Sequence, residues 1–105
     1  MDQLTTRRLE LQSILEGIQG EGHVYYQPPE SVKLKYPCII YHRARVDLRK
    51  ANDGNYLTNS RFTLTLIGKS PDNPVLMDVL SLPYTSYERH YTADNLHHDI
   101  VEIYY

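Results

Sequence analysis

The chain has 105 residues, a net charge of −2 and a single cysteine. This length suits one domain (residues 1–105) with a modest core, and the charge balance excludes a strongly basic nucleic-acid-binding protein. One cysteine cannot form an internal disulfide, and no apolar run approaches the roughly 20 residues that span a bilayer, so we expect a protein that is made in the cytoplasm and contacts no membrane.

Apolar residues of the first segment recur at helical spacing and predict an amphipathic helix over residues 4–19. The stripe consists of Leu4, Leu11, Ile14, Leu15 and Ile18. Thr5 or Thr6 is expected to cap the start of this helix, and Gly20 to end it. Leu9 lies off the stripe, so we expect it at the surface or against a neighbour.

Three strands are expected next. A short one at residues 23–27 is stopped by two prolines and should lie at a sheet edge, because proline lacks an amide donor. Residues 36–46 begin with an apolar run, and residues 61–67 alternate between apolar and polar side chains. An Asp-Gly turn signal within residues 51–55 predicts that these two strands form a long antiparallel hairpin. Its outer half, residues 43–60, is too polar for a core and should project as an arm or loop.

The last part of the chain predicts one more helix and two more strands. The helix is expected at residues 75–82, with Asn73 as its N-cap and Pro74 at its first position. Strands follow at residues 84–91 and 96–105. The order α-β-β-β-α-β-β predicts an α+β fold: a mostly antiparallel sheet with two flanking helices on one side and a long projecting β-hairpin.

Tyrosine dominates the aromatic content, with ten Tyr, one Phe and no Trp. Tyrosine fills half-buried strand positions well, and it also suits surfaces that are wet before assembly and buried after it. For any single tyrosine, a half-buried strand position is the favoured interpretation. The ten tyrosines together favour a surface that is buried on assembly.

Potential metal ligands gather near the C-terminus. They are His90, Asp94, His97, His98 and Asp99. Adjacent strand residues point to opposite faces, so His97 and His98 cannot easily share one ion, and the spacing matches no zinc motif. We therefore expect polar strand and turn residues here, with no metal site and no cofactor.

The sequence also offers no set of candidate catalytic residues at a suitable spacing. Cys38 and His42 would share a strand face but lie roughly 13 Å apart at the rise of a strand, beyond hydrogen-bond reach. Cys38 also lies in an apolar run, which is typical of a core residue. Asp94 and Asp99 are a carboxylate pair of the kind that any protein offers. No glycine-rich phosphate loop occurs, so the sequence predicts no catalytic residue and no enzyme.

The predicted arm and the C-terminus are the most distinctive features. The arm carries, at alternate positions, Arg43, Arg45, Asp47 and Arg49. Alternation would place these residues on one strand face, where mixed charges can set the register between subunits. A solvated hairpin face, or nucleic-acid contact through the arginines, is compatible with the same pattern. The aromatic end, Tyr104 and Tyr105, should be held in the sheet or at a subunit contact. All six residues are candidates for a subunit or lumen interface.

Three stretches resemble a family of small tail proteins of long-tailed bacteriophages. They are VYYQPP at residues 24–29, KYPCIIY at residues 35–41 and YERHYTADNLHHD at residues 87–99. The family comprises tail-terminator or tail-completion (head–tail joining) proteins. The resemblance extends over most of the chain, and none of the three stretches is a catalytic motif.

The resemblance implies a virion structural protein at the head-proximal end of the tail. Such proteins form a ring, commonly a hexamer, that caps the tail tube and presents a surface to the head-completion or connector protein. The implied partners are further copies of the chain, the tail tube protein and the connector, with passing contact to genomic DNA if the arm lines the lumen. The family's fold, an antiparallel sheet with flanking helices, agrees with the predicted order of elements.

Other functions are compatible with the same features. A different neck protein, such as a connector stopper, could have similar size and layout. A host-directed binding module, for example a small inhibitor of a bacterial enzyme, would be a soluble monomer. A small nuclease would need clustered carboxylates for its metal ions, and the sequence offers none.

Overall fold

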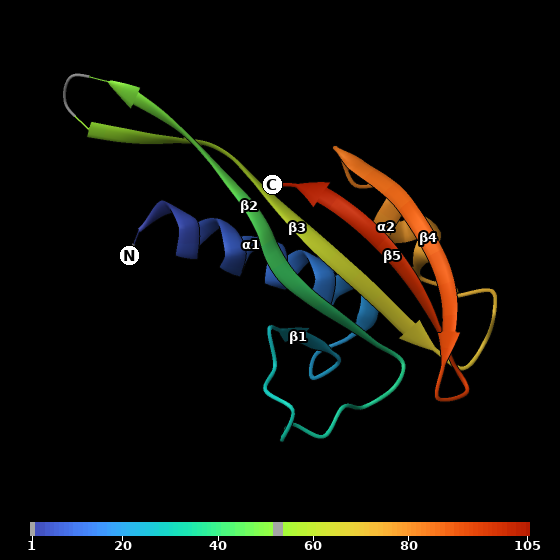
Figure 1. The fold of residues 1–105 in the computed structure, drawn as a ribbon. Helices are drawn as coiled ribbons and strands as arrows, with labels where there is room; N and C mark the ends of the chain where they lie inside the picture. The colour runs from blue at the N-terminus through green and yellow to red at the C-terminus, as the bar shows by residue number, and fades with distance from the viewer. Residues whose placement is uncertain (1, 52–53) are drawn as a thin grey trace.

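Residues 2–51 and 54–105 are described by the computed structural model, and they form one five-stranded sheet that carries two helices on the same face (Figure 1). The order of elements is α-β-β-β-α-β-β, so the predicted α+β fold is confirmed. Neither helix in this part of the chain combines the length and the hydropathy needed to cross a membrane.

Helix α1 (Gln3–Gln19) packs on the sheet through the predicted apolar stripe, of which only the middle is fully buried. Leu11 and Leu15 are fully buried, whereas Leu9 is exposed, as its position off the stripe predicts. The predicted cap was wrong. The Asp2 carboxylate, rather than Thr5 or Thr6, caps the helix by accepting a hydrogen bond of 2.8 Å from the Thr5 amide. Aspartate is among the best N-cap residues, so the helix starts one residue earlier than predicted.

The sheet has the strand order β1-β2-β3-β5-β4. Its strands are β1 (Val24–Tyr26), β2 (Cys38–Ala51), β3 (Gly54–Gly68), β4 (Thr85–Ala93) and β5 (Leu96–Tyr104). The short β1 lies at one edge, as its flanking prolines predict, and pairs in parallel with β2. All other pairs are antiparallel, which gives a mixed but mostly antiparallel sheet.

The core forms where alternate residues of β2, β3 and β5 face the helices. Tyr41, Leu64 and Val101 lie side by side across these strands and are fully buried. The Tyr41 hydroxyl donates to the Gln12 side chain of α1, which satisfies the polar tip of the largest buried side chain. The opposite face of the sheet carries no helix and is called the open face below.

Helix α2 (Leu76–Leu80) is shorter than predicted and buries Val79 against the same core. The predicted Asn73 cap with Pro74 at the first helical position was wrong. The Asn73 side chain accepts from the Val75 amide at 3.0 Å, and its carbonyl accepts from the Leu76 amide. Asparagine forms such local turns readily, so Asn73 and Pro74 make a turn that precedes the helix.

The predicted arm is present and is a continuous hairpin (Figure 1). Strand β5 ends opposite Arg61, so only β2 and β3 continue outward, through residues 46–51 and 54–60. The arm makes the molecule elongated, with extents of 52 × 28 × 23 Å. Residues 52–53 of the predicted turn lie outside the described part of the chain.

Candidate functional site

The charged side chains of the arm do not all share one face, which corrects the expectation from their alternation. Arg43 pairs with Phe62, but Arg45 pairs with Arg61, so Ala44 is an extra residue in β2. Such a β-bulge changes which face the following side chains occupy. Phe62 belongs to the core, and its neighbour Arg61 therefore points to the open face. Arg43 lies on the helix side and Arg45 on the open face.

Arg43 contacts helix α1 within the same chain. Its guanidinium donates to the Leu4 carbonyl at 3.1 Å and lies 5.3 Å from the centre of the Phe62 ring. The carbonyl belongs to the first turns of α1, so this contact joins the helix start to the base of the arm. Arg43 is therefore half-buried and supports the fold of its own subunit.

Arg45, Asp47 and Arg49 follow the bulge without a further extra residue in β2, so these three share one face of the arm. The Arg45 Nε and Asp47 Oδ1 atoms are 2.7 Å apart, and the Arg45 side chain is 62% exposed. The hydrogen bond and the charge of Asp47 raise the pKa of Arg45 above its usual value. Arg49 is also exposed, so the arm presents a surface of mixed charge.

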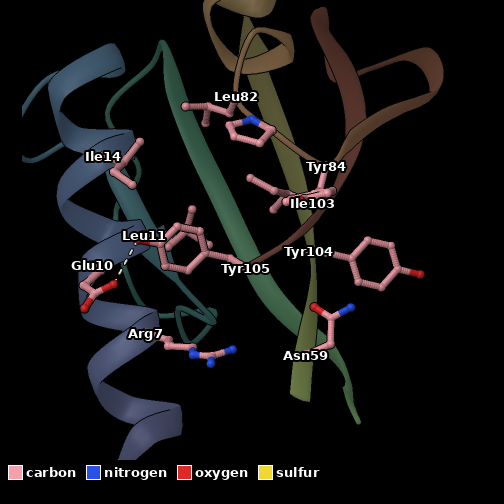
Figure 2. Close-up of a pocket in the computed structure, with 11 residues that line it drawn as sticks. Arg7, Glu10, Leu11, Ile14, Asn59, Leu82, Tyr84, Ile103, Tyr104 and Tyr105 are labelled. Carbon is pink, nitrogen blue, oxygen red and sulfur yellow. Dashed lines mark hydrogen bonds between the residues drawn. The ribbon is translucent and has the colours of Figure 1, made fainter. Parts of the chain in front are cut away.

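The last two tyrosines point in different directions (Figure 2). The Tyr105 ring points toward α1, where its hydroxyl donates to Glu10 Oε2 at 3.0 Å, and its amide donates to the Ser60 carbonyl. Burial, followed by this hydrogen bond, raises the pKa of Tyr105. Tyr104 points away and remains exposed. The chain end is thus held at the sheet, as predicted, but only Tyr104 offers its ring to a partner.

A groove of about 620 Å³ lies beside this chain end (Figure 2). It runs between α1 and residues 82–84, and Ile103 of β5 lies in it. Its walls combine charged side chains, Arg7 and Glu10, with the ring of Tyr84. Tyr84 is 80% exposed, which makes it the most exposed large apolar side chain among the described residues.

The described tyrosines divide between the core and the surface. Tyr41 is buried, and Tyr26 packs against it with 5.0 Å between ring centres. Five others are exposed: Tyr36, Tyr84, Tyr87, Tyr91 and Tyr104. Tyrosine therefore serves as a core residue in β1 and β2, and as a large amphipathic surface residue around β4 and the C-terminus.

The hairpin of β4 and β5 gathers three of the potential metal ligands considered above, His90, His97 and Asp99, beside Tyr87. The Asp99 carboxylate, only 3% exposed, accepts hydrogen bonds of 2.8 Å from the Tyr87 hydroxyl and from His90 Nδ1. His90 Nε2 in turn lies 3.1 Å from His97 Nδ1. The hydrogen bond to Asp99 is the main reason that the pKa of Tyr87 is raised.

The sequence carries a signal for the burial of Asp99 that the expectations above do not use. Asp99 alternates in phase with Val101 and Ile103, whose side chains are buried on the helix side of the sheet. A carboxylate at such a position requires partners, because burying an unpaired charge is costly. The antiparallel register, which places His90 opposite Asp99, supplies them.

The remaining candidate ligands lie elsewhere. His98 is on the open face, stacked on Tyr91 with 4.6 Å between ring centres, so adjacent His97 and His98 do diverge as predicted. Asp94 lies in the tight turn between β4 and β5, with φ of 52°. Across residues 2–51 and 54–105, no group of three or more His, Cys, Asp or Glu side chains is placed to hold a metal ion.

Cys38 is fully buried, as its apolar surroundings predict. Desolvation raises the pKa of its thiol from 9.0 to about 11. His42 is exposed further along the same strand. The thiolate, which is the nucleophilic form of cysteine, is therefore scarce at neutral pH.

Comparison with known proteins adds no assignment: no protein-family model matches this sequence, and no curated protein matches it. The surfaces described above are thus the structural basis for a function. The strongest of them are the charged arm, the groove beside the C-terminus and the exposed tyrosines around β4.

Proposed function

We propose that this chain is a structural protein of a long-tailed bacteriophage that forms a ring, commonly a hexamer, at the head-proximal end of the tail. It caps the tail tube and joins it to the head connector. The resemblance of three sequence stretches to tail-terminator proteins suggests this role. The structural observation that carries the proposal is the two-stranded arm, which extends beyond the five-stranded part of the sheet.

An isolated two-stranded hairpin is marginally stable in water at best. From Val46 outward the arm has this form, because β1 has ended opposite Tyr41 and β5 opposite Arg61. Contact with a neighbouring copy would supply the missing packing. The mixed charges of Arg45, Asp47 and Arg49 would then fix the register of that contact.

A ring requires two different surfaces on each subunit, one for each neighbour. The arm is the first of them in this proposal. The second is the edge of the sheet at β4, with Tyr87 on its helix side and Tyr91 on its open face, together with Tyr84 at the groove. Exposed tyrosines suit an interface that is wet before assembly and buried after it. The role is non-catalytic, and the buried Cys38 thiol is consistent with that.

Reversing two charges on the arm tests this function. We expect Arg45→Glu combined with Arg49→Glu to prevent ring formation while leaving the subunit folded, because both side chains are exposed. Arg43 is left unchanged since it holds α1. The matched control is Lys33→Glu with Lys69→Glu, which reverses two exposed charges away from the arm. Light scattering across a concentration series, alone and with purified tail tubes, measures the assembled mass, and circular dichroism checks folding.

Each outcome decides between functions. Rings or tube-bound complexes that form with the wild type and the control, but not with the arm variant, support the proposal. A wild-type protein that stays monomeric and does not bind tail tubes contradicts the proposal. Binding to portal complexes instead of tubes would identify a connector stopper, and capture of a bacterial enzyme with no virion partner would identify a host-directed module.

A further inference from the structure

The strongest unassigned feature is the pair of imidazole rings on the hairpin of β4 and β5. His90 Nε2 and His97 Nδ1 face each other at 3.1 Å, and the ring centres are 5.2 Å apart. We propose that this pair binds one divalent transition-metal ion such as Zn²⁺ or Ni²⁺, with His90 Nε2 and His97 Nδ1 as the protein ligands. This proposal is independent of the ring-forming function.

The distance between the two nitrogens fits a shared ion. Zinc binds imidazole nitrogen at about 2.0–2.1 Å in tetrahedral geometry, which places two such nitrogens about 3.3 Å apart. The observed separation of 3.1 Å is close to that value. Imidazole suits zinc, copper and nickel rather than magnesium or calcium, so the ligand type selects a transition metal.

Asp99 prepares His90 for this role. It accepts a hydrogen bond from His90 Nδ1 at 2.8 Å, so the His90 proton stays on Nδ1 and the lone pair of Nε2 points toward His97. Metal-binding histidines characteristically donate their second ring nitrogen to a carboxylate, which orients the ring and raises its basicity. The Tyr87 hydroxyl donates to the same oxygen of Asp99 and holds the buried carboxylate in place.

The described residues around the imidazole pair place no arginine against it, and the pair is open to water. Arg89, on the same strand as His90, pairs with Ile100 on the open face and lies over the Tyr91 ring, so it is directed away from the imidazole pair. His90 is partly exposed, so waters can complete the coordination of the ion. In the absence of metal, a proton on His97 Nδ1 can bridge the two rings. Metal binding then requires only that this proton move to His97 Nε2.

Titration of the untagged full-length protein with Zn²⁺, and separately with Ni²⁺, tests the site. We expect one ion per chain by calorimetry or by equilibrium dialysis. His97→Ala should weaken the affinity at least about 10-fold, and Asp99→Asn about 10–100-fold, as is typical when a carboxylate behind a ligating histidine is lost. The matched control, His98→Ala, removes the adjacent imidazole on the open face and should leave the affinity unchanged.

Imidazole nitrogen NMR shifts give a second, site-resolved measurement. Zn²⁺ should shift Nε2 of His90 and Nδ1 of His97, whereas the nitrogens of His98 should not move. If Asp99→Asn fails to fold by circular dichroism, His97→Ala decides the matter. Absence of bound metal in the wild type, or an unchanged affinity in His97→Ala, would overturn the proposal.

Discussion

Burial alone controls the chemistry of Cys38. Its pKa of about 11 lowers the thiolate fraction at pH 8 about 100-fold relative to the ordinary value of 9.0. We expect a thiol reagent to label native Cys38 at least that much more slowly than the unfolded chain, and labelling should accelerate as the pH rises toward 11. Rates measured in buffer and in urea test this. A Cys38→Ser, Ser13→Cys chain, whose thiol lies at an exposed helical position, is the control and should react quickly in buffer. Equal rates for native and unfolded Cys38 would contradict the prediction.

The faces and contacts of some single residues could not be predicted from sequence patterns. Alternation placed Arg43 with Arg45, but Ala44 forms a bulge, and nothing in an alternating pattern reveals an inserted residue. The same limit applies to His90 and His97. They lie seven positions apart, and only the register of the hairpin turns that spacing into a contact. By contrast, the burial of Cys38 was predictable because it depends on its immediate neighbours alone.

At the scale of elements, helix α1 contributes to the core through few side chains. Leu15 is fully buried and Leu9 is exposed on the same helix. We expect Leu15→Ala to reduce the free energy of unfolding by about 2–5 kcal/mol, because it leaves a cavity in the core. Leu9→Ala should change that free energy by less than about 0.5 kcal/mol. Urea denaturation at a concentration where the chain is monomeric measures both. Similar losses for the two variants would show that the helix is docked differently.

The elements themselves were largely predictable, because helical and strand periodicities differ clearly in this chain. The ends of the helices were less predictable. Asp2 extended α1 by one residue, and the turn formed by Asn73 and Pro74 delayed the start of α2. The arm was predicted from its polarity. The Asp-Gly turn signal predicted the hairpin, but whether its outer half is paired strand or loop depends on the register between β2 and β3, which polarity does not encode.

At the scale of the whole molecule, the core and the proposed assembly surface occupy separate parts of the chain. The buried apolar residues belong to α1, α2 and the part of the sheet inside the arm's base, whereas none of residues 44–50 in β2 is buried. The arm therefore adds length without adding to the core. This separation fits a subunit that folds alone and uses its extension to reach a neighbour.

Shortening the arm puts this separation to the test. Val46 pairs with Ser60, so replacing residues 47–59 by Asn-Gly, a sequence that favours tight hairpin turns, should close β2 on β3 without disturbing the core. We expect the melting temperature of the shortened monomer to stay within a few degrees of the wild type, since a loss of 1 kcal/mol shifts it by only about 4–8 °C in a domain of this size. Ring formation and tube binding should both be lost. A shortened chain that still assembles would place the subunit contact on the sheet, whereas one that unfolds would show that the arm supports the core.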